Sequence, residues 1–239
     1  MGKILLILFL SLFISCNEPK EKHPTKQDYT LAILAIVNNF SDSCLSDYGT
    51  LNPLFTIYYN DIFSSYPISC ETVIIGDSTM DLSRQTTFYD TVKTYNYSVS
   101  GNTACDYLQQ MEYVKCQNPK NILIATADGN GVLRGVSSST SISTIEKVIN
   151  RSRVKWNPEK IIVIGIHPVL VTSANTNKNS VNNGVSQIPN ICYINPLPIW
   201  GATETDNPRV DWMIDSIHYQ SNVYDLYKTQ ILNQCGVGL

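Results

Sequence analysis

Five short hydrophobic runs recur along the chain, and each is rich in β-branched residues. Runs of this length, bounded by Gly, Pro, Asn or Ser, are typical of strands. Lys160–Ile166 has the most strand-like composition of the five. We therefore predict strands at Thr72–Ile75, Val92–Val99, Asn121–Ala125, Lys160–Ile166 and Ile191–Ile194.

Segments with helix-like spacing of apolar residues alternate with these runs. The predicted helices are Leu82–Asp90, Ala104–Cys116, Ser143–Arg153 and Tyr219–Gln234. Pro168–Pro189 is so rich in Asn, Ser and Thr that we predict a long polar connection there. Strands that alternate with helices indicate an α/β fold with a mostly parallel sheet covered on both faces. In such sheets, ligands bind beyond the carboxyl ends of the strands.

The first residues have the character of an export signal. Residues 1–16 combine a positive charge at Lys3 with an apolar run that is too short to span a bilayer. The run ends in Phe13-Ile14-Ser15-Cys16, which resembles a bacterial lipobox, so we expect lipid on Cys16 and attachment to a membrane. An ordinary secretory signal is the alternative. Residues 17–27 are polar and charged, and we predict a flexible tether there.

The rest of the chain fits one domain with an extension. Residues 28–70 contain a helix-like stretch, Tyr29–Phe40, and then a Ser-, Asn-, Pro- and Tyr-rich segment without a clear period. We predict that residues 28–70 pack on a main domain at residues 71–239. The net charge of −3 gives no reason to expect nucleic acid as a partner, since nucleic-acid binding normally requires a basic surface.

The cysteines also favour an exported protein. Apart from Cys16, six of the seven cysteines remain, and an even number in an exported chain indicates disulfides. Many pairings are possible, and the sequence alone does not choose among them. A zinc site is the competing interpretation, but no two cysteines have the close spacing of structural zinc ligands. Pairing of nearest neighbours would give Cys44–Cys70, Cys105–Cys116 and Cys192–Cys235.

The first candidate for chemistry follows the first predicted strand. Thr72–Ile75 leads into Gly76-Asp77-Ser78. A serine hydroxyl therefore stands at the carboxyl end of a strand, where an α/β sheet presents reactive groups. The alternative is an ordinary helix start, because Asp-Ser pairs are common in turns and N-caps.

The second candidate precedes the last predicted helix. Asp215 and His218 place a carboxylate and an imidazole three residues apart. A nucleophilic serine needs a base, and that base needs an anion to fix its tautomer. A capping aspartate beside a surface histidine is the alternative. Of the other histidines, His23 lies in the tether, and His167 has no acidic neighbour in sequence, so we expect His167 to be a loop residue or a substrate contact.

Together these motifs resemble the SGNH hydrolases, also called GDSL esterases and lipases. Gly76-Asp77-Ser78 matches the block that ends a strand in that family, and Asp215 with His218 matches its Asp-x-x-His block. Asn96-Tyr97-Ser98-Val99-Ser100-Gly101 resembles the block whose last glycine donates a backbone N–H to the oxyanion hole. Asp128-Gly129-Asn130-Gly131 resembles the Gly-x-Asn-Asp block, whose asparagine adds a further donor.

The resemblance spans Thr72–Gln234 and implies a three-layer, flavodoxin-like fold with a five-stranded sheet. It implies a serine hydrolase without metal or organic cofactor, in which Ser78 is the nucleophile, His218 the base and Asp215 the residue that orients the base. The implied oxyanion hole consists of the backbone N–H groups of Ser78 and Gly101 and the side-chain amide of Asn130.

The resemblance also has departures and leaves the substrate open. Ser98 stands where the family often has glycine, and Gly131 replaces the aspartate after the asparagine. An esterase, lipase, thioesterase or O-acetyl esterase would all fit, although acylated glycans and lipids suit an exported protein better than coenzyme A thioesters. A protein of the same fold that binds glycan or lipid without catalysis is the alternative. The loops expected to set specificity carry no recognisable motif: Ser41–Cys70, Val132–Thr140 and Thr172–Pro189.

Overall fold

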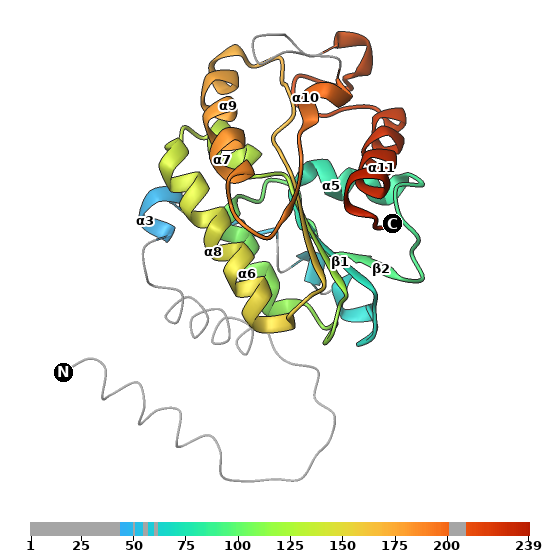
Figure 1. Cartoon of the computed structure of the whole chain (residues 1–239). Helices are drawn as coiled ribbons and strands as arrows, with labels where there is room; N and C mark the ends of the chain where they lie inside the picture. The colour runs from blue at the N-terminus through green and yellow to red at the C-terminus, as the bar shows by residue number, and fades with distance from the viewer. Residues whose placement is uncertain (1–43, 50, 55–56, 60–61, 201–208) are drawn as a thin grey trace, which may run out of the picture. The chain divides into compact units, whose positions relative to one another are not determined.

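The computed structural model describes residues 44–49, 51–54, 57–59, 62–200 and 209–239. The expected signal with Cys16, the tether and the helix-like stretch at Tyr29–Phe40 lie outside the described residues. The chain divides into two units, and all described residues belong to the second, Ser43–Leu239. The following description concerns that unit alone (Figure 1).

Five parallel strands form one sheet in the order β2-β1-β3-β4-β5. The central strand, β3, pairs along its whole length with β1 on one side and β4 on the other. The predicted α/β fold with a five-stranded sheet is confirmed, and every strand is parallel. The strands are β1 (Thr72–Gly76), β2 (Thr94–Asn96), β3 (Asn121–Ala125), β4 (Lys160–Ile164) and β5 (Cys192–Ile194).

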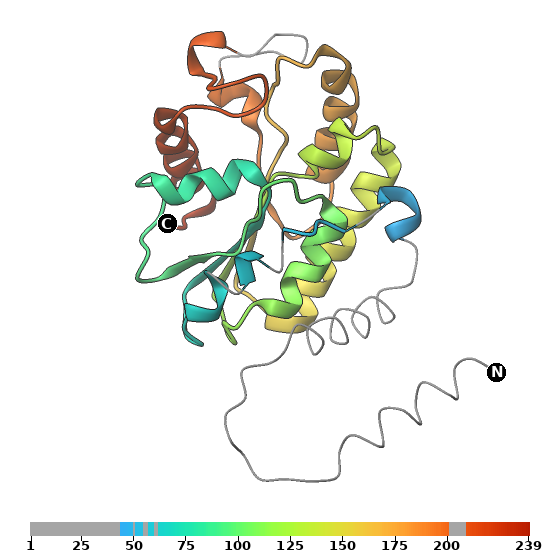
Figure 2. The same cartoon turned by 180° about the vertical axis from the view of Figure 1, so that it is seen from behind.

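Helices cover both faces of this sheet (Figures 1 and 2). On one face lie α6 (Ala104–Tyr113), α8 (Ser138–Trp156) and α9 (Thr172–Ser186), which contact one another in that order. On the other face lie the short α5 (Ser78–Leu82) and the C-terminal α11 (Ser221–Cys235). The shorter elements are α3 (Cys44–Tyr48), α7 (Gly129–Leu133) and α10 (Pro196–Ile199), and the 3-10 turns η1 (Phe63–Ser65), η2 (Ser83–Gln85) and η3 (Val210–Trp212).

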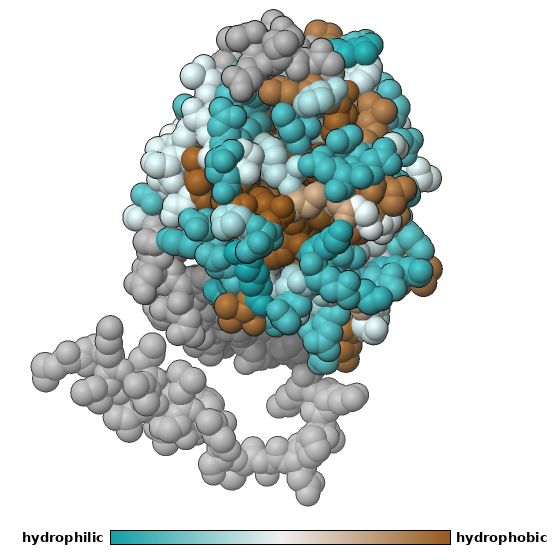
Figure 3. All heavy atoms as spheres, viewed as in Figure 1, coloured by the Kyte–Doolittle hydropathy of each residue, from teal (hydrophilic) through white to brown (hydrophobic). Residues whose placement is uncertain are grey.

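Alternation along the strands divides the core between these two faces. Strand side chains alternate between opposite faces of a sheet. Ile74 and Leu123 therefore point to the same side, where they form one buried cluster with Tyr224, Tyr227 and Ile231 of α11. In the space-filling view, hydrophobic residues also gather in the middle of the visible face, between hydrophilic ones (Figure 3).

Two predictions of secondary structure are wrong, one of a helix and one of a loop. The segment predicted as a helix at Leu82–Asp90 holds only the end of α5 and the turn η2, because the helix starts earlier, at Ser78. Pro168–Pro189, predicted as a polar connection, contains α9. Ala174, Val181 and Val185 of α9 are buried at helical spacing, so tertiary packing favours the helix despite its many Asn, Ser and Thr residues.

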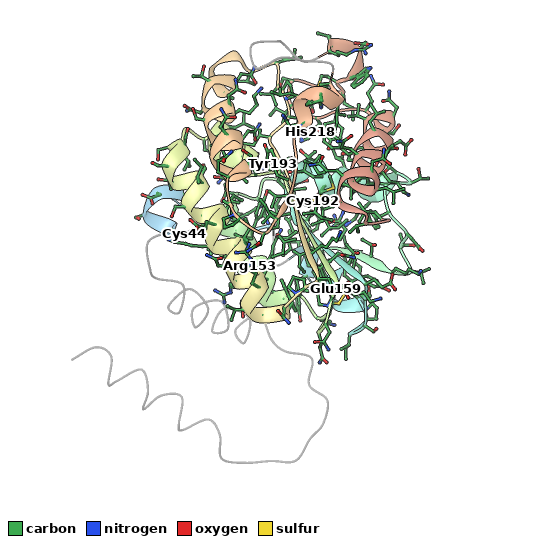
Figure 4. The ribbon with its side chains drawn as sticks, viewed as in Figure 1. Cys44, Arg153, Glu159, Cys192, Tyr193 and His218 are labelled. Carbon is green, nitrogen blue, oxygen red and sulfur yellow. A yellow bond between two sulfur atoms is a disulfide. The ribbon has the colours of Figure 1, made fainter. Side chains whose placement is uncertain are left out.

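The disulfides correct two of the three expected pairs. Cys192–Cys235 is present as predicted, but the other bonds are Cys44–Cys105 and Cys70–Cys116. Cys44 and Cys192 are labelled in Figure 4. Cys105 lies in the first turn of α6, whereas Cys116 follows its last turn. A helix rises about 1.5 Å per residue, so these two cysteines lie roughly 15 Å apart, which is too far for a disulfide.

The described part of the extension packs on the main domain. Besides the Cys44–Cys105 bond, Phe63 and Tyr66 contact the ring of Tyr97, with ring centroids 5.0 and 5.1 Å apart. Three disulfides indicate that this protein works in an oxidising environment outside the cytoplasm. Among the described residues, no helix has the length and apolar character needed to cross a membrane.

Candidate active site

Ser78 lies at the turn between β1 and α5, and buried contacts hold this turn. It is the first residue of α5, and Asp77 caps the helix by accepting a hydrogen bond from the Thr79 backbone N–H at 3.0 Å. The other oxygen of Asp77 accepts a hydrogen bond from the Thr126 hydroxyl at 2.8 Å, which ties the turn to the end of β3. Burial raises the pKa of Asp77, although these hydrogen bonds oppose the shift. The capping role considered for this Asp-Ser pair is therefore present, and it places the Ser78 hydroxyl at the carboxyl end of the sheet.

His218 contacts Ser78 although 140 residues separate them in the sequence, and Asp215 contacts His218. The Nε2 atom of His218 lies 2.8 Å from the Ser78 Oγ, and its Nδ1 atom lies 2.8 Å from the Asp215 Oδ2. Figure 4 labels His218 in the upper part of the view, and Ser78, which it contacts, is the first residue of α5. The structure thus brings the three predicted residues into one chain of hydrogen bonds, in the order serine, imidazole and carboxylate.

The loop that carries Asp215 and His218 is fixed by its own backbone. Met213 and Tyr219 form an antiparallel bridge, and the Ile214 N–H donates to the His218 carbonyl oxygen at 2.8 Å. The Asp215 Oδ1 accepts the backbone N–H groups of Ile217 and His218, both at 2.7 Å. Slight burial acts to raise the pKa of Asp215, but hydrogen bonds from the His218 ring and from these two N–H groups lower it to about 2. Asp215, whose side chain is half exposed, is therefore ionised at neutral pH.

A cleft of about 460 Å³ opens around these residues, and we call it the outer cleft. Gly101 and Asn130, the predicted oxyanion donors, both line it together with Ser78. Gly101 has φ of +82°, a conformation that glycine adopts without strain. The full lining is Ser78, Leu82, Ser100, Gly101, Asn130, Ile214, Asp215, Ile217 and His218.

Asn52, from the extension, holds the loop that contains Gly101. Its Nδ2 donates to the Ser100 carbonyl oxygen at 2.7 Å and to the Asn102 Oδ1 at 2.6 Å. The Asn130 Nδ2 donates to the Asn102 carbonyl oxygen at 2.9 Å. The loop of Gly101 and the side chain of Asn130 are therefore connected through Asn102. The sequence pattern gave no indication of the role of Asn52.

Asp128, two residues before Asn130, is a buried carboxylate that accepts hydrogen bonds from three parts of the chain. Its carboxylate accepts hydrogen bonds from the Tyr48 and Ser141 hydroxyls, both at 2.6 Å, and from the Ala104 N–H at 2.8 Å. Burial raises the pKa of Asp128 to about 6 in spite of these bonds. A Cβ atom at Gly131 would lie 2.2 Å from the Asp128 Oδ2. The buried carboxylate therefore excludes any side chain at position 131, which explains the departure from the Gly-x-Asn-Asp pattern.

Ser98, the other departure, lies next to Gly76 at the end of β1. Its side chain is fully buried, and its backbone N–H donates to the Asn96 Oδ1 at 2.9 Å. Ser98 does not line the outer cleft. Ser98 therefore does not form part of the surface that faces this cleft.

His167 is a buried loop residue and does not contact Ser78 in the manner of a base. Its Nε2 lies 2.6 Å from the Ile217 carbonyl oxygen, and its ring stacks on Trp200. Burial lowers the pKa of His167 to about 4, so the ring is neutral at pH 7. Between His167 and His218, only His218 has the geometry of a base for Ser78. In the part of the chain that the structure describes, no three His, Cys, Asp or Glu residues are grouped as a metal site would require.

Comparison with known proteins supports the fold. No protein-family model and no curated protein sequence matches this chain. Among solved structures, it is similar to a Streptococcus pneumoniae protein provisionally named a platelet activating factor, with 13% identity, a TM-score of 0.64 and coverage of 85% of this chain and 98% of the other. It is also similar to Axe2, an acetylxylan esterase from Geobacillus stearothermophilus (15% identity, TM-score 0.55, coverage 70% and 95%).

A third similar structure belongs to the lipolytic G-D-S-L family, from Veillonella parvula (15% identity, TM-score 0.55, coverage 69% and 97%). All three likenesses extend over nearly the whole of the other chain. The chain therefore has the fold of the GDSL, or SGNH, hydrolases.

Proposed function

We propose that this protein is a serine hydrolase that cleaves carboxylic esters through an acyl-enzyme on Ser78. The observation that carries the proposal is the continuous contact from the Ser78 Oγ through both ring nitrogens of His218 to the ionised Asp215. Nucleophilic serine catalysis requires a base in contact with the hydroxyl and an anion behind that base. Similarity in fold to an acetylxylan esterase and to a lipolytic G-D-S-L protein agrees with it.

In the first half of the reaction, His218 Nε2 takes the proton of the Ser78 hydroxyl while the Oγ atom bonds to the ester carbonyl carbon. The carbonyl electron pair moves to its oxygen, and the Ser78 and Gly101 backbone N–H groups with the Asn130 amide stabilise that oxyanion. Each such donor contributes roughly 2.7–4 kcal/mol to transition-state stabilisation. The His218 imidazolium then gives its proton to the leaving alcohol as the carbon–oxygen bond breaks.

In the second half, water replaces the alcohol. His218 takes a proton from the water, whose oxygen attacks the acyl carbon. Collapse of the second tetrahedral intermediate releases the acid and returns the proton to Ser78. Asp215 stays ionised throughout and holds the His218 Nδ1 proton, so the imidazole always presents Nε2 to the serine.

We further propose that the protein is exported in a bacterium and attached to the cell envelope through lipid on Cys16. The lipobox-like Phe13-Ile14-Ser15-Cys16 and the polar residues 17–27 support this arrangement. The three disulfides of the described domain agree with export. Substrates would then be acylated glycans, lipids or small esters outside the cytoplasm.

The decisive experiment measures hydrolysis of p-nitrophenyl acetate by the full chain in mild detergent. We expect Ser78→Ala and His218→Ala to lower kcat at least about 10³-fold, because each removes a member of the proposed unit. Ser216→Ala removes an exposed hydroxyl from the same loop as His218 and should leave kcat unchanged.

A fluorophosphonate probe provides a second readout that does not depend on the ester chosen. It should label wild type but not Ser78→Ala. If wild type is no faster than the variants and takes no label, the hydrolase proposal fails, and a glycan- or lipid-binding module of the same fold becomes the better interpretation.

A further inference from the structure

Two hollows of different size meet at Ser78. One is the outer cleft, with a volume of about 460 Å³. The other, which we call the inner cavity, has a volume of only about 20 Å³. Ser78, Asn130 and Ile217 line both hollows, so the two hollows adjoin each other at the candidate nucleophile.

The proton path decides which part of an ester lies in which hollow. The leaving alcohol receives its proton from His218, so its oxygen must lie beside that ring. His218 and Asp215 line the outer cleft but not the inner cavity. The alcohol therefore occupies the outer cleft, and the inner cavity beside Ser78 is available to the acyl group.

The walls of the inner cavity suit a small apolar group. Val132, Leu133, Ile166, Val169 and Ala174 contribute aliphatic side chains, and all except the half-buried Leu133 are buried. The polar groups at Asp77 and Thr126 are bonded to each other, and the His167 ring is bonded to the Ile217 carbonyl. Most of the cavity surface is therefore apolar, although the buried Lys178 also belongs to its wall.

The volume of the inner cavity limits the length of the acyl chain. A cavity needs roughly 10–15 Å³ to hold one water molecule. At about 20 Å³, the inner cavity has room for one group of that size, which is about a methyl group. A propyl or pentyl chain would have to push buried side chains apart, and packed interiors resist such insertion.

We propose that the substrates are acetyl esters, whose methyl group fills the inner cavity while a larger alcohol lies in the outer cleft. This inference rests on the proposed hydrolase function and adds the acyl specificity to it. Val169 and Leu133 are the specificity-determining side chains that limit chain length.

The test compares p-nitrophenyl acetate, butyrate and hexanoate, each rate being normalised to its hydroxide-catalysed hydrolysis. For wild type we expect kcat/KM for acetate to exceed that for hexanoate by about tenfold or more, because one methylene in a closed pocket discriminates by roughly 10–200-fold. Val169→Ala and Leu133→Ala should each reduce this ratio about tenfold or more by raising the rate on hexanoate. Val181→Ala removes the same atoms as Val169→Ala, but from a buried position on α9 that does not line the cavity. The acetate-to-hexanoate ratio of this variant should equal that of wild type.

The ratio is taken within one protein sample, so partial unfolding of a variant does not affect it. Equal or faster hydrolysis of hexanoate by wild type would overturn the acetyl proposal while leaving the hydrolase standing. A preference for the half-ester of succinate, whose carboxylate could approach the buried Lys178 in the cavity wall, would overturn it as well. Absence of turnover on every ester, together with absence of fluorophosphonate labelling, would overturn both proposals.

Discussion

At the scale of single residues, the carboxylate of Asp215 makes three hydrogen bonds, and only one of them goes to the imidazole ring. Oδ1 accepts two backbone N–H groups, from Ile217 and His218, and Oδ2 faces the His218 Nδ1. In Asp215→Asn, the two N–H groups require the amide oxygen at the Oδ1 position. The amide NH₂ must then face Nδ1, so that nitrogen becomes an acceptor and the ring proton moves to Nε2.

We expect Asp215→Asn to lower kcat by about 10⁴-fold, the order found for the corresponding change in a serine protease triad. The protonated Nε2 could no longer accept the proton of Ser78. Steady-state kinetics on p-nitrophenyl acetate measures the loss, and ¹⁵N shifts of the His218 ring report the tautomer. Because hydrogen bonds hold the pKa of Asp215 near 2, wild type should retain an ionised Asp215 at every pH above about 4.

Asp211→Asn is the matched control for this change. Asp211 is an exposed carboxylate that pairs with Arg209, with 2.9 Å between the Arg209 Nη2 and the Asp211 Oδ2. It should keep kcat within about twofold, as exposed ion pairs contribute little. A loss of less than tenfold in Asp215→Asn would contradict the proposed role of Asp215.

Some residues of the candidate site could be predicted from the sequence, and others could not. Ser78, Asp215 and His218 were predicted because each lies in a short local motif beside a predicted strand or helix. Asn52 and Asp128 were not, because their partners lie far away in sequence: Asn102 is 50 residues from Asn52, and Tyr48 is 80 residues from Asp128. No local pattern records such long-range hydrogen bonds.

At the scale of elements, the segment at residues 51–54 holds a loop of the proposed active site through Asn52. Asn52 binds the loop before α6 through its Nδ2, and its backbone N–H donates to the Asp106 Oδ1 at 2.7 Å. We expect Asn52→Ala to lower kcat by roughly 10–100-fold with little change in KM, because a misplaced oxyanion donor affects the transition state more than the bound substrate. Kinetics on p-nitrophenyl acetate measures both constants.

Asn121→Ala provides the control at the opposite end of the sheet. Asn121 begins β3, and its side-chain amide bonds the Thr72 hydroxyl at 3.3 Å, so the variant also loses one hydrogen bond. It should change stability slightly and kcat hardly at all. Equal effects of the two substitutions on kcat would show that Asn52 acts only through general stability.

Helices and strands could be predicted where the pattern of apolar residues in the sequence matches the residues that are buried in the fold. The strands β1, β3 and β4 are buried over nearly their whole length and have continuous apolar sequences. In α9, by contrast, Ala174, Lys178, Val181 and Val185 are buried at helical spacing, but the Asn, Ser and Thr residues between them favour loops on local grounds. Packing against α8 decides in favour of the helix, and a local sequence pattern does not contain that contact.

At the scale of the whole molecule, two of the disulfides connect different parts of the fold. Cys192–Cys235 joins β5 to the end of α11, whereas Cys44–Cys105 joins α3 to the start of α6. The bonds span 43 and 61 residues, a difference that changes the chain entropy of the unfolded state by only about 0.3 kcal/mol. Nearness in sequence did not predict the second bond, because the fold places the N-terminal extension beside α6.

We expect removal of either bond, as Cys192→Ala with Cys235→Ala or as Cys44→Ala with Cys105→Ala, to lower the free energy of unfolding by about 2–4 kcal/mol. Urea unfolding followed by circular dichroism measures this loss. Only the second pair should also lower kcat in samples that remain folded, since Cys44 anchors the helix whose Tyr48 binds Asp128 behind Asn130. If both pairs kept wild-type kcat, the extension would stabilise the domain without shaping its active site. If both pairs lowered kcat equally, the loss would reflect general destabilisation of the domain rather than the Tyr48–Asp128 contact.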